Sequence, residues 1–204
     1  GASTLITAHF FADMELMGIV SHVFDGLNKY SLMAIPMFIL AGSFLSKGGA
    51  AKRIIDFAKS IVGHLPGGLP ISAIFAAMIF AAVSGSSPAT VAAIGSVMFS
   101  AIKEAGYPQG YAIGTIATSG SLGILIPPSI VFIVYGVTAD LSIGKLFMAG
   151  VIPGLLIGFM LMAITYIGAV RLGFKKEKPA SFKERLLKFK EAFWALMLIV
   201  IVIG

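Results

Sequence analysis

Long stretches without charge dominate the hydrophobic pattern of this chain. Asp, Glu, Lys and Arg are all absent from five segments, 30–46, 60–102, 105–139, 146–170 and 192–204. About 20 apolar residues suffice for a helix to cross a bilayer. The pattern therefore predicts an all-α, polytopic membrane protein.

Composition agrees with this pattern and excludes several kinds of chemistry. Hydrophobic residues make up 58% of the chain, charged residues 12%, and the mean hydropathy is +0.99. Without cysteine, neither a disulfide nor a thiolate nucleophile can form. The sequence also lacks the glycine-rich phosphate loop that binds ATP in many proteins.

The position of the basic residues explains the net charge of +6. Of the 15 Lys and Arg residues, eight lie in 171–190, four in 47–59 and one at Lys103, which leaves Lys29 and Lys145. If the first three groups share the cytoplasmic side, 13 cations face inward and two outward, as the positive-inside rule expects. The basicity therefore indicates membrane topology, and we expect no nucleic-acid partner.

The segment 69–104 is apolar but is interrupted at its centre by "SGSSP" at 84–88. Each arm of about 15 residues reaches about 22 Å, which is short of a hydrocarbon core of about 30 Å. One unbroken helix would be too long and would place Pro88 in its interior. The pattern predicts a re-entrant helical hairpin that turns within the membrane and returns to the cytoplasmic side at Lys103.

The next segment is interrupted by "TSGSLGILIPPS" at 118–129. A proline pushes the residue before it out of the helical region, so Ile126 and Pro127 are predicted to be extended. This predicts a discontinuous helix that crosses outward. An ordinary span over 146–170 follows, and its Gly150, Gly154 and Gly158 form a small-residue packing face.

The flanking segments complete the predicted organisation. Residues 1–68 form scaffold and interfacial helices, with a span over 30–46 kinked near Pro36 and an amphipathic helix over 47–65 that lies in the interface or packs on the protein. Residues 69–104 form the hairpin and 105–170 the other transport-domain helices. Residues 171–190 form a cytoplasmic basic linker that is partly helical, and 191–204 begin the next transmembrane helix. Because the chain starts without Met and stops inside an apolar run, we expect a longer protein.

The two interruptions predict one shared site, because irregular backbone at membrane depth needs protein or water around it. Half-helix N-termini expose amides that suit a carboxylate. Ser87 is predicted as the N-cap of the second hairpin arm with Pro88 as its first residue, and Pro128 begins the other half-helix. The predicted substrate-binding residues are Ser87, Pro88, Ala89, Thr90, Pro128 and Ser129.

Carbonyl and hydroxyl oxygens around 84–86 and 118–121 suit an alkali cation, and such broken helices are typical of secondary transporters. Between Ser60 and Ala139 only His64 and Glu104 could relay a proton, and both lie at segment edges. Sodium is therefore favoured as the coupling ion. A channel lined by the hairpin and a membrane scaffold without transport activity remain open alternatives.

Five motifs carry a family resemblance. They are "SLMAIPMFILAG" (31–42), "GG…KRIIDFAKSIVGHLPGGL" (48–69), "FAAVSGSSPATVAAIGSV" (80–97), "GILIPPSIVFIVYGV" (123–137) and "SIGKLFMAGVIPGLL" (142–156). Together they closely resemble the first half of the large membrane subunit of tripartite ATP-independent periplasmic (TRAP) transporters.

The resemblance implies one half of an inverted-repeat, elevator-type carrier in the bacterial inner membrane, driven by Na+, and not an enzyme. It implies a small membrane subunit and a periplasmic substrate-binding protein as partners, and a small organic acid as substrate. The variant at 84–90 looks most like C4-dicarboxylate carriers, with sialic acid or another organic acid as the alternative. The residues implied to hold sodium are Ser84, Gly85, Ser86, Thr118, Ser119, Gly120, Gly123 and Pro127.

Overall fold

The computed structural model describes residues 16–174 and 179–203, and these residues form helices and no strand. The predicted all-α class is confirmed for this part of the chain. Predictions for residues 1–15, 175–178 and 204 lie outside it. The elements in chain order are α2 (Leu16–Leu27), η1 (Tyr30–Met33), α3 (Ala34–Lys47), α4 (Ala50–Val62), α5 (Gly68–Ser84), α6 (Ser87–Glu104), α7 (Gln109–Gly120), α8 (Leu122–Leu125), α9 (Ile130–Thr138), α10 (Ile143–Arg171) and α11 (Phe182–Ile203).

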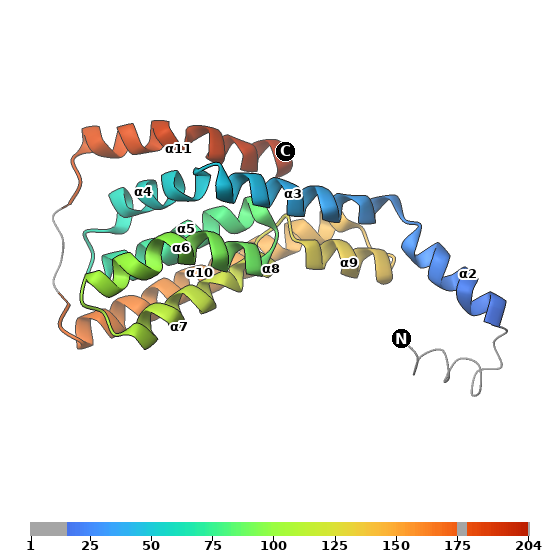
Figure 1. Cartoon of the computed structure of the whole chain (residues 1–204), viewed down its shortest axis with the longest axis horizontal. Coiled ribbons are helices and arrows are strands. Elements are labelled where there is room, and N and C mark those ends of the chain that lie inside the picture. The colour runs from blue at the N-terminus through green and yellow to red at the C-terminus, as the bar shows by residue number, and fades with distance from the viewer. Residues whose placement is uncertain (1–15, 175–178, 204) are drawn as a thin grey trace.

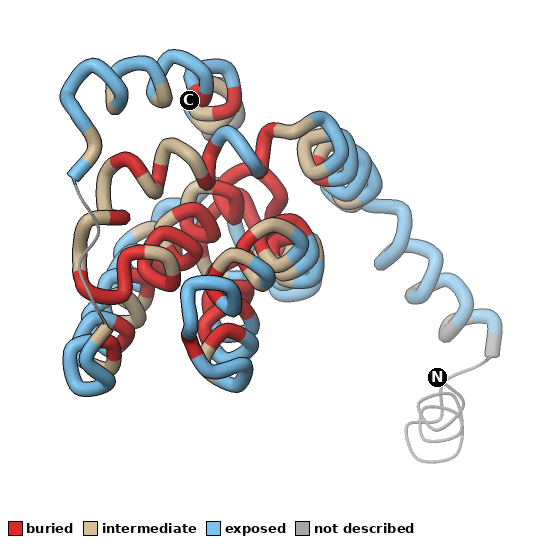
Figure 2. Tube along the Cα trace, turned by 60° about the vertical axis from the view of Figure 1, so that its left-hand side comes forward, coloured by how far each residue is buried: buried red, intermediate tan, exposed pale blue. Residues whose placement is uncertain are grey.

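Helix α5 is the centre of the bundle. It packs against α4, α6, α7, α8 and α10, with α11 outside α4 (Figure 1). All but three of its residues are buried, because small and apolar side chains surround the whole helix. Figure 2 shows this buried centre, and it shows α2 as an exposed helix that projects away from the bundle.

The core beside α5 is built from branched and aromatic side chains on neighbouring helices. Ile54 and Ile55 of α4, Phe80 of α5, and Ile94 and Met98 of α6 are at most 1% exposed. These side chains fill the space that the alanines of α5 leave open. The hairpin arms α5 and α6 are therefore fixed to α4 as one packed unit.

Two helices in the described part are long and apolar enough to cross a membrane, over Tyr30–Lys47 and Ile143–Arg171. A third crossing is possible if the bent pair Gln109–Leu125 and Ile130–Thr138 counts as one. The hairpin arms contain 17 and 18 residues, so each reaches about 26 Å. Both arms are slightly longer than predicted but still short of a hydrocarbon core of about 30 Å.

Helix α4 has the predicted amphipathic pattern. Ile54 and Ala58 are buried against the bundle, whereas Lys52 and Arg53 are exposed. This arrangement supports a helix packed on the protein, one of the two possibilities that the sequence left open.

Pro36, where the sequence predicts a kink, is the third residue of α3, directly after the 3₁₀ turn η1. Proline is tolerated in the first turn of a helix, and α3 continues from Ala34 to Lys47. The predicted linker 171–190 is partly helical, as expected, but α11 begins at Phe182 and not at the predicted residue 191. The basic residues from Lys183 onward and the following apolar residues therefore share one helix.

Candidate functional site

The hairpin turns within two residues. After α5 ends at Ser84, Gly85 has a left-handed backbone with φ of 59°, and Ser86 is extended. A left-handed glycine commonly ends a helix because it lacks a Cβ that would clash. The N-cap of α6 is therefore Ser86 and not Ser87 as predicted, and Pro88 is the second helical residue.

A buried hydroxyl network closes this turn. Ser84 and Thr90 are fully buried, and their hydroxyl oxygens lie 3.0 Å apart. Thr90 Oγ1 donates to the carbonyl of Ser86 at 2.9 Å, so Ser84 donates the bond between the two hydroxyls. The last turn of α5 is thus bonded to the first turn of α6.

The second interruption lies between α8 and α9. Ile126 is extended, as predicted, and a cis peptide bond joins Pro127 to Pro128. Ser129 is also extended and is the N-cap of α9, so the predicted start at Pro128 is wrong by two residues. The helix starts later because Ser129 is extended, and the N–H of Ile130, which has no partner within the helix, bonds to the hairpin turn. The two halves are bent by 41°.

The predicted unwinding at 118–121 is absent from the structure. Thr118, Ser119 and Gly120 are the last residues of α7, and α8 follows after Ser121 alone. The hydroxyls of Thr118 and Ser119 bond to carbonyls of the preceding helical turn, at 2.7 and 2.9 Å. Such bonds are compatible with a helix, whereas the prolines further on are not. The open backbone is therefore at 126–129.

The two interruptions contact each other directly, as predicted. The N–H of Ile130 donates to the carbonyl of Gly85 at 3.1 Å. A Cβ on Gly85 would lie 2.7 Å from the Pro128 oxygen, and one on Gly123 would lie 2.8 Å from the Ser86 oxygen. Only glycine allows this approach. Gly120 is similarly close to the side chain of Val91.

Ser129 is the most informative polar residue of the site. It is 0% exposed, and its Oγ has no hydrogen-bond partner in the described part of the chain. Although Ser129 is the N-cap of α9, its hydroxyl does not cap that helix. A buried hydroxyl without a partner costs about 1–3 kcal/mol, which a bound ligand would offset.

The predicted site residues differ in accessibility. Thr90, Gly123, Pro127, Pro128 and Ser129 are buried. Ser86, Ser87 and Ala89 are half-buried, and Pro88 and Thr118 are exposed. The first turn of α6 is thus open to its surroundings. The described residues contain no group of three His, Cys, Asp or Glu side chains suited to a metal, so the site offers neutral oxygens and amides.

The glycine face of α10 supports the second interruption. Gly150, Gly154 and Gly158 are buried, which confirms the predicted packing face. A Cβ on Gly154 would lie 2.8 Å from Cγ1 of Ile126, and Gly150 is equally tight against Phe132.

The sequence did not indicate which partners this face has, nor that Gly42 of α3 lies against Ser84. The motif "LAGS" at 40–43 was the one available signal, since small residues mark close helix contacts.

Comparison with known proteins agrees with this geometry. The family model described as "Tripartite ATP-independent periplasmic transporter, DctM component" matches residues 1–204. The chain belongs to this family. The predicted resemblance is therefore confirmed, and the chain is a membrane-embedded component of a transporter and not an enzyme.

Similar proteins include three large TRAP permeases. The chain is 46% identical over its whole length to the C4-dicarboxylate permease DctM of Pseudomonas aeruginosa, covering 48% of that protein. It is 49% identical over 89% of its length to DctM of Rhodobacter capsulatus, covering 44%. It is 42% identical over its whole length to the 2,3-diketo-L-gulonate permease YiaN of Escherichia coli, covering 47%. The chain thus spans about half the length of these relatives.

Proposed function

We propose that this chain is half of a sodium-driven importer that carries a small carboxylate across the bacterial inner membrane. The observation that carries the proposal is the contact of Gly85 with Ile130, which brings two helix N-termini together beside the buried, unpartnered hydroxyl of Ser129. Helix N-termini attract anions. Broken helices that meet at one point are typical of carriers.

Helix α10 supports a position of this site within the membrane. Gly67 at the base of the hairpin lies against Ala169, near one end of α10, whereas Ile126 lies against Gly154. These two contacts are 15 residues apart, or about 22 Å along a helix. Another 11 residues of α10 extend beyond Gly154 to Ile143, about 16 Å. The hairpin is therefore proposed to be re-entrant, with its turn well inside the bilayer.

Oxygen atoms at the two interruptions fit a small hard cation. Three uncharged oxygen ligands of the kind that alkali ions bind are close to the turn. They are the carbonyls of Ser84 and Ser86 and the hydroxyl of Ser129. Gly85 and Gly123 have no side chains that would crowd the turn, although the Ser86 carbonyl already accepts bonds from the N–H and the hydroxyl of Thr90. Sodium would act here as a transported co-substrate. Of the predicted ligands, Thr118 and Ser119 are the weakest, since their hydroxyls already bond within α7.

The proposed substrate is a small carboxylate held by the first turns of α6 and α9. Thr90, Ser87 and Ser129 surround these turns, and no cationic side chain comes from them. The names of similar proteins, which include C4-dicarboxylate, isethionate and 2,3-diketo-L-gulonate permeases, support an organic acid. A C4-dicarboxylate is proposed because the most similar of these relatives carry that name.

The chain is proposed to work as one of two inverted repeats in an elevator-type carrier. Its relatives are about twice as long, which leaves room for a second hairpin and a second wall of the site. A periplasmic binding protein would deliver the substrate, and a small membrane subunit would join the scaffold helices.

The decisive experiment measures uptake of labelled succinate by the full-length protein with its partners in proteoliposomes, with and without an inward sodium gradient. We expect saturable uptake that requires sodium. Ser129→Ala should lower sodium-stimulated uptake by about 10-fold or more, since a charge-associated hydrogen bond is worth about 1.5–3 kcal/mol. Its melting temperature should stay the same or rise, because the buried unpaired hydroxyl is removed.

Ser96→Ala is the matched control, because Ser96 is an exposed residue of α6 whose hydroxyl bonds only within its own helix. Its uptake should equal that of the wild type. Uptake that is the same with and without a sodium gradient would refute sodium as the driving ion. Flux that does not saturate with substrate concentration would favour a channel. Uptake at the wild-type rate in Ser129→Ala would show that Ser129 is not part of the binding site.

A further inference from the structure

Helix α11 combines two different surfaces along its length. Its second half, from Ala192 onward, is uncharged, whereas its first half carries four cations and four exposed large apolar side chains. Phe182, Leu186, Leu187 and Phe189 are 81%, 58%, 55% and 42% exposed. Trp194, near the boundary of the two halves, is 76% exposed, and tryptophan prefers the membrane interface.

The cations of this first half are not equivalent. Lys188 donates a hydrogen bond to Glu191 at 2.9 Å and lies 3.8 Å from Asp56, and the bond to Glu191 raises the pKa of Lys188. Arg185 is half-buried. Lys183 and Lys190 are exposed and form no ion pair within the described part of the chain.

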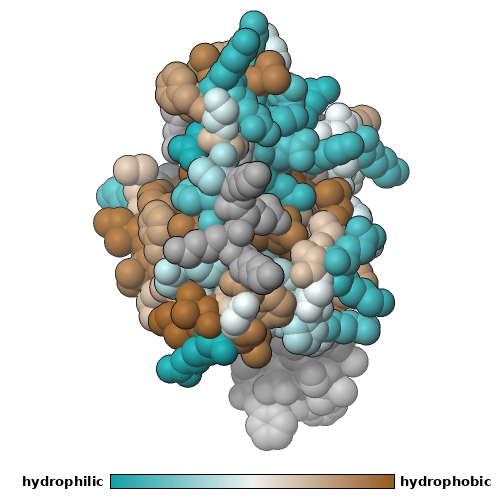
Figure 3. Space-filling model, turned by 90° about the vertical axis from the view of Figure 1, so that its left-hand side faces the viewer, coloured by the Kyte–Doolittle hydropathy of each residue, from teal (hydrophilic) through white to brown (hydrophobic). Residues whose placement is uncertain are grey.

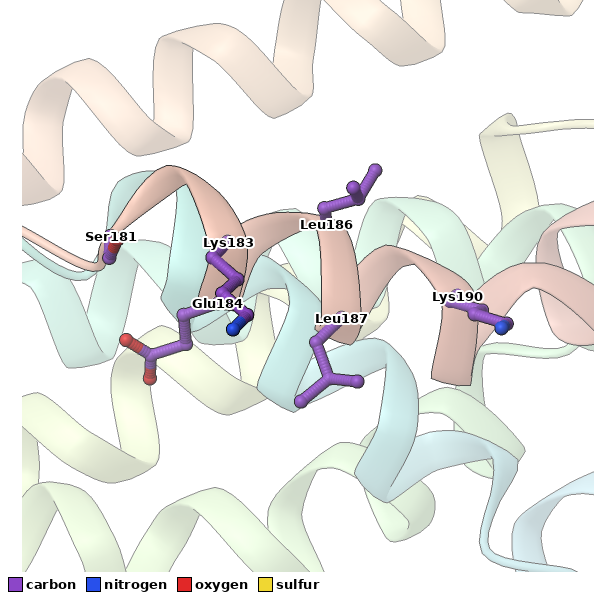
Figure 4. A pocket seen from close by; sticks show the side chains of 6 residues that line it. All are labelled: Ser181, Lys183, Glu184, Leu186, Leu187 and Lys190. Carbon is purple, nitrogen blue, oxygen red and sulfur yellow. The ribbon is translucent and has the colours of Figure 1, made fainter.

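The two free lysines flank an apolar groove. Residues 183, 187 and 190 lie on the same side of the helix, and Lys183 and Lys190 are two turns apart, about 10 Å. Figure 4 shows them on either side of Leu186 and Leu187. The groove has a volume of 520 Å³ and is lined by Ser181, Lys183, Glu184, Leu186, Leu187 and Lys190.

Glu184 is the one acidic residue in this lining, and it also borders a second cavity beside Lys59 and Lys188. Asp56 also borders that second cavity. The groove itself has a lysine near each end and two leucines between them. Figure 3 shows the corresponding mixture of hydrophilic and hydrophobic surface at the end of the molecule where α11 begins.

We propose that the first half of α11 binds an anionic phospholipid, with Lys183 and Lys190 contacting its phosphate and Leu186 and Leu187 its acyl chains. A zwitterionic lipid would satisfy the apolar surface but not the free charges. The same helix enters a long apolar stretch directly after Glu191, which places the first half of α11 at the membrane interface. An anionic lipid is thus the partner that complements both features.

The test is native mass spectrometry of the detergent-solubilised full-length protein with added phosphatidylglycerol or phosphatidylcholine. The wild type should retain phosphatidylglycerol preferentially. Lys183→Gln with Lys190→Gln should weaken this preference by about 30-fold, which is the combined effect of two lysines near an anionic surface. Each single substitution should cost about 5-fold, whereas Lys183→Arg with Lys190→Arg should retain the preference.

Lys29→Gln with Lys145→Gln is the matched control, because it removes the same charge at exposed positions far from α11 along the chain. This control should bind like the wild type. An unchanged preference in the Lys183 and Lys190 variants, or an equal loss in the control, would overturn the proposal. Displacement of the lipid by soluble glycerol phosphate would overturn it too, because the site would then bind a free phosphate.

Discussion

Gly85 has two roles in the site, each of which requires glycine. Its φ of 59° turns the chain from α5 to α6, and its missing side chain lets Pro128 approach. A Cβ there would be 2.7 Å from the Pro128 oxygen, which is part of the backbone and cannot rotate away. The position of the second interruption therefore depends directly on this residue.

We predict that Gly85→Ala destabilises the protein by about 2–4 kcal/mol, which combines left-handed strain with overpacking. Sodium-stimulated uptake should be lost, because the contact with Ile130 shifts. Thermal unfolding and proteoliposome uptake measure the two effects. Gly114→Ala is the control, since it is a helical position with open space around it, and it should be neutral or slightly stabilising.

The buried pair of Ser84 and Thr90 gives a second prediction at this scale. Thr90→Val should cost about 1–3 kcal/mol, because it removes the bond to Ser86 and leaves the Ser84 hydroxyl with only a long bond of 3.4 Å to the Ser86 carbonyl. Adding Ser84→Ala should recover part of this loss, since the two residues interact directly. Thr138→Val, at an exposed helix end, should change the melting temperature little. Strictly additive effects of the pair would contradict the network.

Among the elements, α10 is the support against which the interrupted helix is positioned. Leu125, Ile126 and Phe132 pack against its glycine face. The residues around the bend between α8 and α9 therefore contact the backbone of α10 and not its side chains. Small residues allow this close approach. A larger residue there would displace the interruption and with it Ser129.

Gly154→Val is expected to destabilise the protein by about 1–3 kcal/mol through overpacking against Ile126. Uptake should fall by more than the loss of folded protein explains, because the site moves with Ile126. Gly144→Val near the start of α10 meets no crowded neighbour and is the control. Normal uptake in a folded Gly154→Val protein would show that the contact does not position the site.

For the whole molecule, topology is the testable property. The proposed re-entrant hairpin returns to the side from which it started, whereas the discontinuous helix crosses. Since the chain contains no cysteine, single thiols can be introduced and labelled. Lys103→Cys should react with a membrane-impermeant reagent only from the cytoplasm, and Asp140→Cys only from the periplasm. Both residues are exposed, so packing should not prevent labelling.

A hairpin that crosses the whole membrane would give a different result. Ser87→Cys would then react readily from the periplasm, as freely as Asp140→Cys. In the re-entrant arrangement its labelling should be slow and should decrease when substrate is present. Ser181→Cys, before α11, should follow the cytoplasmic pattern of Lys103→Cys.

Much of this architecture could be predicted from local pattern. Charge-free segments predicted helices, and the prolines at 88 and 127–128 predicted where helices are interrupted, because a proline acts on its own neighbours. The same reasoning misplaced three boundaries, at Ser86, Ile130 and Phe182. Where each of these helices begins depends on backbone contacts with other segments or on the preceding residues joining the same helix. The periodicity of apolar residues along the sequence does not encode either.

The sequence by itself determined the membrane class, the two interruptions and the packing face of α10, since each follows from residue chemistry within one segment. Only the tertiary structure decided that Thr118 and Ser119 stay helical and that Ile130 bonds to Gly85. It also decided that the Ser129 hydroxyl is left without a partner. The bond between Ile130 and Gly85 joins segments more than 40 residues apart across helices, and no local propensity specifies such a contact.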